Sequence, residues 1–309
     1  MSRDMIDAAS AHAAAPSALL PGDRLAAETH MDAVTLYVRD IDAMVAFYTN
    51  VIALEVLAND AADGRDAVVT LGRGTTPLVV LREARDLPPR RPGEAGLFHT
   101  AILFADAAGL AATLARVAQL APQLYTGAGD HLVSEAFYLD DPEGNGIELY
   151  VDRPRETWGH VNGQIRMDTI YLDPNAYLST HLDEAVLSAV ERQSGGVGHV
   201  HLQVGDVGVA RGFYVDALGF EVTASLHASA LFASAGGYHH HVAMNTWNSR
   251  GAGPRAATLG LADVAITLPA REDLDALAAR LRRRGLDFAD DGASIALDDP
   301  WGTRVTLSL

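Results

Sequence analysis

The chain has 309 residues, of which 49% are hydrophobic and 20% charged, a composition typical of a folded protein with room for about two domains. Its formal net charge of −17 disfavours nucleic acid as a partner, because phosphate binding needs clustered lysine and arginine. There is no cysteine, which excludes disulfides, thiolate metal sites and cysteine nucleophiles.

Residues 1–29 are rich in alanine and are expected to form a partly ordered N-terminal arm. They lack a basic stretch followed by a continuous apolar run, so they are not typical of a signal peptide. No apolar run of the chain is long enough to span a bilayer. The sequence therefore favours a cytoplasmic protein that does not associate with membranes.

An internal repeat relates residues 32–56 to residues 198–222. Six residues recur at constant spacing: Val38, Asp40, Phe47, Tyr48, Glu55 and Val56 match Val204, Asp206, Phe213, Tyr214, Glu221 and Val222. In each stretch a short alternating strand ends at an aspartate, which is placed to cap a helix with apolar residues at helical spacing. A further strand follows.

A second pair of repeated segments lies later in each half. Residues 139–144 (LDDPEG) recur as residues 297–302 (LDDPWG), and Asp-Pro-x-Gly between strand-like runs indicates a hairpin turn. Between these marks, a strand-like run over residues 98–104 is followed by a helical run over residues 110–120. In the second half, a strand-like run over residues 262–268 is followed by a helical run over residues 274–281. The chain is thus expected to contain four repeated units in an α+β fold.

The repeat also predicts the domain boundaries. Residues 30–152 and 195–309 form the two halves, with two units each. Residues 153–194 join the halves and contain prolines and a polar stretch. A connector of this length is expected to have structure of its own and to pack on the halves.

The first strand of the second half carries two histidines. His199 and His201 alternate with apolar residues, so both point to one face of a sheet. The equivalent residues of the first half are Ala33 and Thr35. A single strand histidine is most often structural, whereas two on one face favour a functional site.

Residues 238–241 (YHHH) add three consecutive histidines in the third unit. They are flanked by strand-like sequence, so neighbouring histidines are expected to point to opposite faces. One or two of them would then enter a pocket, and a polar edge strand is the alternative.

The second unit contributes His99, at the start of a strand, and Glu148, which alternates with apolar residues in GIELY. Their counterparts in the second half are Asp263 and Thr306. Neither half alone therefore offers two histidines and one glutamate at these equivalent positions.

The second and third units together do offer this set, as His99, Glu148 and His199. Two imidazoles and one carboxylate form the facial triad that suits non-haem Fe(II) oxygenases and leaves positions open for substrate and O₂. His131 and Tyr138 lie between the second-unit residues and are candidates for acid–base or hydrogen-bonding work.

These residues carry a family resemblance. Its marks are Gly198-His199-Val200, Leu97-Phe98-His99, residues 130–134 (DHLVS), Tyr138 ten residues before Glu148, and the YHHH run before Val242. In residues 30–152 and 195–309 the chain resembles the vicinal oxygen chelate superfamily, which shares the glyoxalase, bleomycin-resistance and dioxygenase fold, and in particular the two-domain extradiol catechol-2,3-dioxygenases. The resemblance implies four βαβββ units in two tandem domains that form open barrel-like sheets.

The resemblance also implies roles for individual residues: His99, Glu148 and His199 as metal ligands, His240, His131 and Tyr138 as catalytic residues, and His239 and His201 as substrate-binding residues. His239 is the close alternative to His240 as the acid–base residue. The metal would be Fe(II), although Mn(II) accepts the same ligands. The reaction implied is the opening of a catechol ring by O₂ in aromatic catabolism, by a homo-oligomer.

The chain departs from the family in the placement of its ligands. In well-known extradiol enzymes all three ligands come from the C-terminal half, where this chain has Asp263 and Thr306. We therefore expect the second and third units to pair across the halves and to hold the metal. The first and fourth units would pair without one, because Ala33 and Thr306 cannot replace the missing ligands.

Two other functions fit the same fold. One is a metal-dependent lyase or isomerase of the glyoxalase type, whose sites use more carboxylate or glutamine ligands. The other is a non-catalytic protein that binds a small molecule, which would lack a complete ligand set. The histidine-rich pocket favours the dioxygenase, and the sequence does not identify the preferred catechol.

Overall fold

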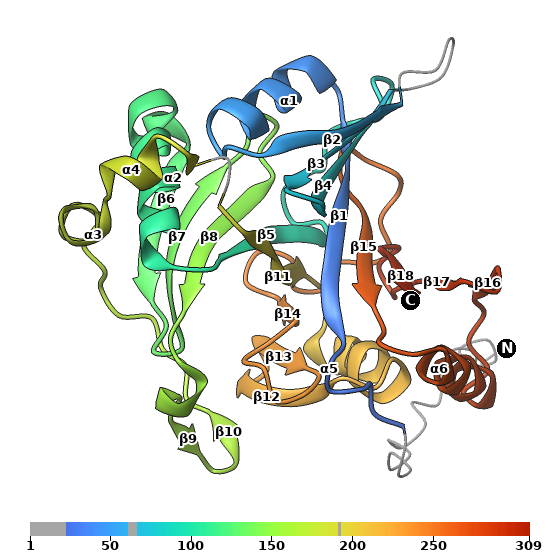
Figure 1. Cartoon of the computed structure of the whole chain (residues 1–309). Coiled ribbons are helices and arrows are strands. Elements are labelled where there is room, and N and C mark those ends of the chain that lie inside the picture. Colours follow the sequence, from blue (N-terminus) through green and yellow to red (C-terminus); the bar gives the residue numbers. More distant parts are fainter. Residues whose placement is uncertain (1–22, 61–66, 191–192) are drawn as a thin grey trace, which may run out of the picture.

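The computed structural model describes residues 23–60, 67–190 and 193–309. Of the arm predicted over residues 1–29, residues 1–22 lie outside the described ranges. Among the described residues, no helix combines the length and the apolar character needed to cross a membrane. The described chain forms a mixed α+β fold around two large sheets (Figure 1).

The first sheet has eight strands in the order β16-β17-β18-β15-β1-β4-β3-β2. Its strands are β1 (His30–Val38), β2 (Glu55–Asp60), β3 (Val68–Arg73), β4 (Thr76–Glu83), β15 (Gly260–Thr267), β16 (Ala289–Asp290), β17 (Ser294–Asp298) and β18 (Arg304–Ser308). The helices of these units are α1 (Ile41–Asn50) and α6 (Arg271–Arg283). The first and fourth units therefore share one sheet.

The second sheet also has eight strands, in the order β12-β13-β14-β11-β5-β8-β7-β6. Its strands are β5 (Gly96–Phe104), β6 (Tyr125–Asp130), β7 (Ser134–Asp140), β8 (Gly146–Asp152), β11 (Gly195–Gln203), β12 (Glu221–Leu226), β13 (Ala230–Ser234) and β14 (Val242–Asn245). The associated helices are α2 (Ala107–Leu120), the short η1 (Pro122–Leu124), α5 (Val207–Arg211) and the π-helical turn η4 (Gly212–Ala217). The second and third units therefore share this sheet.

This pairing across the halves confirms the arrangement expected from the ligand positions. Strands β5 and β11 pair antiparallel, with His99 opposite His201, and β1 and β15 pair in the same way, with Thr35 opposite Asp263. The four βαβββ units and the vicinal oxygen chelate fold are as predicted. Each sheet, however, contains strands from both halves of the chain. The division into two domains at residues 30–152 and 195–309 therefore stays a proposal.

The helices begin where the repeat predicts. The side chains of Asp40 and Asp206 accept hydrogen bonds from the backbone N–H groups of Ala43 and Val209, three residues into each helix. Such a cap stabilises a helix by about 1 kcal/mol. Helix α1 then buries an apolar face against the first sheet, so the cap fixes both its start and its orientation.

A second repeated pair links each helix to the following unit. The Tyr48 hydroxyl donates to Asp141 at 3.2 Å, and the Tyr214 hydroxyl donates to Asp299 at 3.0 Å. Asp141 lies in the turn between β7 and β8, so this bond joins the first unit to the second; the bond to Asp299 joins the third unit to the fourth. The two sets of repeated residues therefore meet in space.

Replacing Tyr48 with phenylalanine should lower the free energy of unfolding by about 2 kcal/mol, a usual value for a hydrogen bond to a charged group. Burial raises the pKa of Asp141 to about 6, and the Tyr48 hydroxyl opposes this shift. A raised folded-state pKa means that the stability contributed by this carboxyl is lost as pH rises through about 6. Losing the Tyr48 hydroxyl should therefore lower the free energy of unfolding more at neutral pH than in acid.

Urea unfolding of wild type and variant at pH about 4 and about 7.5 measures this difference. Tyr37→Phe is the matched control, because its hydroxyl makes no hydrogen bond to the described residues. An equal loss of stability at both pH values would contradict a charged acceptor at Asp141.

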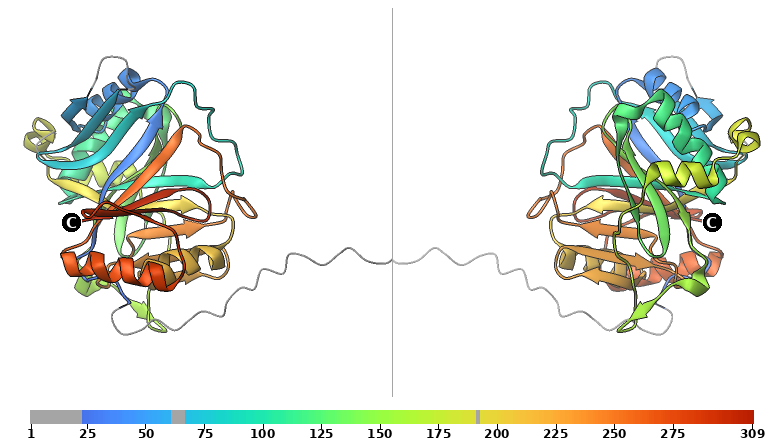
Figure 2. Two further views of the ribbon diagram at one scale, coloured as in Figure 1. Left: turned by 90° about the vertical axis from the view of Figure 1, so that its right-hand side faces the viewer. Right: turned by 90° about the vertical axis from the view of Figure 1, so that its left-hand side faces the viewer.

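The connector has the structure predicted for it. It contains η2 (Arg155–Thr157), the hairpin of β9 (His160–Val161) and β10 (Gln164–Ile165), and the helices α3 (Pro174–His181) and α4 (Glu184–Leu187). The ring of Tyr177 packs on Phe137, with centroids 4.9 Å apart, and Val190 belongs to a small buried cluster with Ala53 and Ala112. The side views show α3 and α4 against one side of the molecule and the hairpin at its lower end (Figure 2).

Candidate metal centre

Three neighbouring strands of the second sheet bring the predicted ligands together. His99 lies on β5, His199 on the adjacent β11 and Glu148 on β8, on the other side of β5. The Glu148 Oε2 atom is 2.9 Å from His99 Nε2 and 3.2 Å from His199 Nε2. Ligand atoms of the three residues all lie within 4.8 Å of one another, close enough to hold one ion.

The burial and contacts of this group are compatible with a bound cation. All three side chains are buried, with at most 6% of each residue exposed. His99 Nε2 is close to the carboxylate but has no hydrogen bond of acceptable geometry within the described chain. A buried nitrogen without a partner is costly, and a metal ion placed between the two imidazoles and the carboxylate would satisfy it.

The protonation states also suit metal binding. Burial lowers the pKa of His199 to about 4, so its imidazole is neutral at pH 7. Burial would raise the pKa of Glu148, but the neighbouring His199 and His99 outweigh it and hold that pKa well below its usual range. A neutral imidazole and an ionised carboxylate are the forms that bind metals.

A glycine allows His199 to reach this position. The Tyr150 hydroxyl passes directly over Gly198, and a Cβ atom there would lie 1.7 Å from it. Tyr150 in turn shares a hydrogen bond of 2.7 Å with the hydroxyl of Tyr238. Any larger residue at position 198 would displace Tyr150, whose ring packs on His199 with centroids 4.9 Å apart.

His201 lies beside the centre and faces the cavity. Its ring is 5.0 Å from that of His99, and Asn245 Nδ2 donates to His201 Nε2 at 2.9 Å. Burial lowers the pKa of His201 well below its usual value, so it is neutral. Asn245 was not predicted from the sequence. It lies on β14 whereas His201 lies on β11, and no local sequence pattern shows that these two strands pair.

His131 and Tyr138 form a hydrogen-bonded pair at the edge of the site. His131 Nδ1 lies 2.9 Å from the backbone carbonyl of Asp168, which can only accept, so Nδ1 carries the proton. The Tyr138 hydroxyl and His131 Nε2 share a hydrogen bond of 2.6 Å, and burial together with the neighbouring Glu148 carboxylate holds the pKa of Tyr138 well above its usual value. Both side chains line the cavity.

The three consecutive histidines do not lie in a strand, contrary to the expectation. Residues 236–241 form an irregular loop between β13 and β14, and all three histidines are buried. The strand prediction was wrong because the two positive-φ glycines, Gly236 and Gly237, turn the chain before β14 begins. Alternation therefore does not set their directions.

Contacts with other residues set these directions instead. His240 lines the cavity, with its ring 4.0 Å from that of His199. His239 is fully buried behind it: its Nδ1 is 2.7 Å from His240 Nδ1, and its Nε2 is 3.0 Å from Asp152. The Nδ1 of His241 accepts the backbone N–H of Ala235.

A second group of ligand atoms overlaps the first. His199, His239 and His240 also place nitrogen atoms within 4.8 Å of one another. This group lacks a carboxylate, and His239 is already bonded to Asp152 and His240. The group with Glu148 is therefore the better candidate for a divalent metal.

The candidate centre opens into a cavity of about 680 Å³. Its lining includes His99, Glu148, His201 and His240, together with Tyr138 and His131. Residues 161–169 of the connector form much of the remaining wall, which the sequence did not predict. His239, expected at the substrate, is not part of this wall.

The equivalent place in the first sheet has different chemistry. Both Asp263 carboxylate oxygens accept the Thr306 hydroxyl, at 2.9 and 3.1 Å. Burial raises the pKa of Asp263, which disfavours its charged form. With Ala33 on the adjacent β1, this pair offers one carboxylate and no imidazole, as the sequence predicted.

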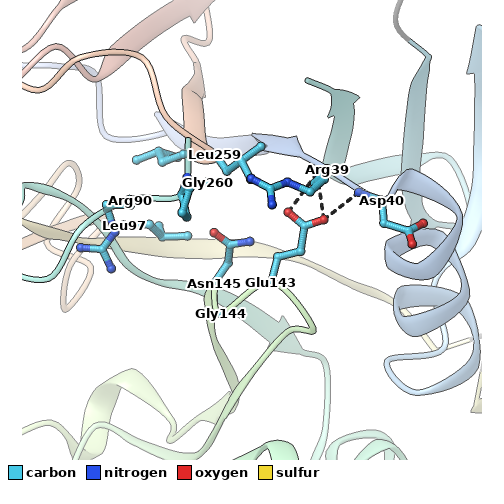
Figure 3. Close-up of a pocket in the computed structure, with 11 residues that line it drawn as sticks. Arg39, Asp40, Arg90, Leu97, Glu143, Gly144, Asn145, Leu259 and Gly260 are labelled. Carbon is cyan, nitrogen blue, oxygen red and sulfur yellow. Dashed lines mark hydrogen bonds between the residues drawn. The ribbon is translucent and has the colours of Figure 1, made fainter. Parts of the chain in front are cut away.

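Another cavity, of about 310 Å³, lies between the two sheets (Figure 3). Its one glutamate, Glu143, accepts the backbone N–H groups of Arg39 and Asp40 at 2.8–3.0 Å. The carboxylate thus ties the β7–β8 turn to the start of α1. No histidine lines this cavity among the described residues, so it is not a metal site of the predicted kind.

Comparison with known proteins gives consistent relatives. A model of the Glyoxalase/Bleomycin resistance protein/Dioxygenase superfamily matches residues 30–149 and 196–307. A catechol-2,3-dioxygenase of Bacillus subtilis (strain 168) is 38% identical over 282 residues, which cover 88% of this chain and 94% of that protein.

Solved structures support the fold alone. A protein of Bacillus subtilis subsp. subtilis str. 168 is similar with a TM-score of 0.60 and 13% identity, over 90% of this chain and 84% of that one. Glyoxalase I of Zea mays is similar with a TM-score of 0.57 and 17% identity, over 91% and 92% of the two chains.

Proposed function

Because the chain belongs to the glyoxalase/bleomycin resistance protein/dioxygenase superfamily, and within it to the catechol-2,3-dioxygenase group, we propose that it opens catechol rings with O₂ as an extradiol dioxygenase. The observation that carries the proposal is the convergence of His99, Glu148 and His199 on one point beside a large cavity. We assign Fe(II) as the metal and these residues as its ligands. The wider proposal is a cytoplasmic homo-oligomer of aromatic catabolism.

The donor set fits this metal. Two imidazole nitrogens and one carboxylate oxygen form a facial triad, and His99 and Glu148 face the cavity so that positions stay open on that side. Bound there, Fe(II) would supply the redox chemistry that couples a catechol to O₂, which side chains do not carry. Mn(II) fits the same ligands.

Tyr138 and His131 would bind the catechol hydroxyls and take up their protons. Both side chains line the cavity, where they are placed to hydrogen-bond a substrate hydroxyl. A proton taken from the diol would move along the hydrogen bond between the Tyr138 hydroxyl and His131 Nε2. This pair therefore orients the diol and removes a proton from it.

His240 would act as the acid–base residue of the reaction. It lines the cavity, and burial lowers its pKa well below the usual value, so it is a neutral base at rest. His239, held by Asp152, fixes the position of the His240 ring through the Nδ1 contact. His239 is a positioning residue in this scheme.

The experiment is an assay of anaerobically purified protein loaded with Fe(II) or Mn(II). We expect one bound metal ion per chain, one O₂ consumed per catechol, and a yellow ring-opened semialdehyde as product. Metal-loaded protein that binds catechol without consuming O₂ would overturn the proposal. Activity on a thiohemiacetal with no O₂ requirement would point instead to a lyase or isomerase.

A further inference from the structure

The cavity has room for more than one aromatic ring. Its volume of about 680 Å³ lies in the middle of the range of about 300–1,000 Å³ that suits drug-sized ligands. The deep end holds the ligand residues His99 and Glu148, which are nearly inaccessible to solvent. The remaining volume therefore extends from the metal centre to the surface.

Three exposed apolar side chains gather where the cavity meets solvent. Val161 is 54% exposed, Leu226 48% and Trp247 48%, and all three line the cavity. They come from the connector hairpin, the end of β12 and the segment after β14, which are far apart in sequence. Exposed apolar side chains that gather from separate segments indicate a binding surface.

This rim is held in place from both sides. Gln164 of the hairpin hydrogen-bonds Ser225 of β12 at 3.4 Å, and the neighbouring Ile165 is buried against Val133 and Trp158. The lower part of Figure 1 shows β9 and β10 close to the β12–β13 end of the sheet. The hairpin is therefore a fixed wall of the cavity.

Trp247 connects the rim to the inner wall. Its backbone N–H donates to Asn245 Oδ1 at 3.0 Å, and Asn245 also holds His201. The indole ring lies 5.5 Å from the ring of Phe98 and 5.4 Å from that of His201. A continuous apolar and aromatic surface thus runs from the metal centre to the surface of the protein.

The orientation of a bound catechol follows if the proposed function holds, and the present inference rests on it. Its diol points to the buried ligands, so the opposite ring edge faces the mouth. We propose that the preferred substrate is a catechol with an apolar alkyl or aryl substituent on that opposite edge, and that Val161, Leu226 and Trp247 determine this preference. Arg166 and Asp168, both exposed at the same cavity, carry opposite charges and select for neither sign.

Alkylcatechols substituted opposite the diol, from methyl to butyl, test the preference. Full burial of a methylene group is worth a factor of about 4 and the rim is half exposed, so kcat/KM should rise by about twofold per carbon. Trp247→Ala and Leu226→Ser should each flatten this rise, measured as the ratio of kcat/KM for each alkylcatechol to that for unsubstituted catechol on the same variant. Leu120→Ser is the matched control, because Leu120 is equally exposed but lies on α2.

A binding measurement separates this inference from the proposed function. Alkylphenols have no vicinal diol, so their binding is measured without turnover. Trp301 does not line this cavity, and Trp158 is buried behind Val133 and Ile165 of its wall, so the quenching that is due to Trp247 is the part lost in Trp247→Phe.

The outcomes of the two measurements are distinct. Catechol cleavage with equal kcat/KM for all chain lengths would overturn the inference and leave the proposed function intact. Chain-length-dependent quenching without cleavage of any catechol would overturn the proposed function and leave the apolar subsite. Quenching that is undiminished in the Trp247→Phe protein would place the alkyl chain elsewhere and also overturn the inference.

Discussion

Replacing Glu148 with alanine should give a folded protein that retains no metal and cleaves no catechol. Glu148 supplies the one carboxylate of the centre, and its Oε2 atom lies within 3.2 Å of both histidine nitrogens. Losing a residue that only supports a ligand weakens metal binding by about 10- to 100-fold, so losing a ligand should exceed about 100-fold. Activity should fall at least as far.

The protein should still fold, because the substitution does not leave a buried charge behind. The pKa of His199 is lowered to about 4 by burial, so that ring is neutral without its partner at pH 7. The measurements are metal content by elemental analysis, O₂ uptake with catechol, and the thermal midpoint of unfolding in metal-free buffer. A midpoint close to that of the metal-free wild type would show that the fold persists.

The first sheet provides the matched control. Thr306 occupies the position equivalent to Glu148 on β18, where it bonds Asp263. Thr306→Ala should leave metal content and turnover unchanged, although it removes a polar contact at the equivalent, less buried place in the first sheet. Full metal content in the Glu148→Ala protein would rule out this centre, whatever the activity.

The convergence of His99, Glu148 and His199 was predictable from the repeat, because the repeat shows which of these residue types each half lacks. Strand alternation assigns a face to each residue, and the repeat aligns His99 with Asp263 and Glu148 with Thr306. Since neither half holds the full set, only pairing of the second and third units completes it. Antiparallel pairing of β5 with β11 is that arrangement.

Other parts of the site could not be predicted, because contacts between distant segments create them. The YHHH loop lacks alternation, and its histidines are directed by Asp152 and His199, which are far away in sequence. The rim residues Val161 and Trp247 have no local pattern that marks them as part of a site. The position of Val161 depends on how the connector packs on β12, and that of Trp247 on its hydrogen bond to Asn245.

The two overlapping groups of candidate ligand atoms differ in the free energy of binding a metal ion. A divalent ion at His99, Glu148 and His199 is partly neutralised by a carboxylate and gives His99 Nε2 the partner that it lacks. An ion at His199, His239 and His240 would meet only neutral imidazoles and would break the contact between the last two. Burying a charge without an opposite charge is unfavourable, so a divalent ion should bind at His99, Glu148 and His199.

Replacing His240 with phenylalanine tests this choice and the proposed role of His240 together. We expect metal content equal to wild type and a kcat lower by about 10²- to 10⁴-fold, the range for losing a general acid–base residue. KM for catechol should change less than kcat, because Tyr138 and the metal hold the diol. His239→Phe should also keep its metal and should lose less activity, since His239 acts only by positioning His240.

Elemental analysis and steady-state O₂ uptake on the two variants decide between the positions. If both variants lose the metal while Glu148→Ala keeps it, the ion binds at His199, His239 and His240, and the carboxylate is not a ligand. If the metal stays and kcat is unchanged in His240→Phe, the centre is correctly placed but proton transfer runs through Tyr138 and His131 alone. Retained metal with a slow kcat is the result that the buried geometry predicts, because His240 faces both the cavity and His199 without being needed to hold the ion.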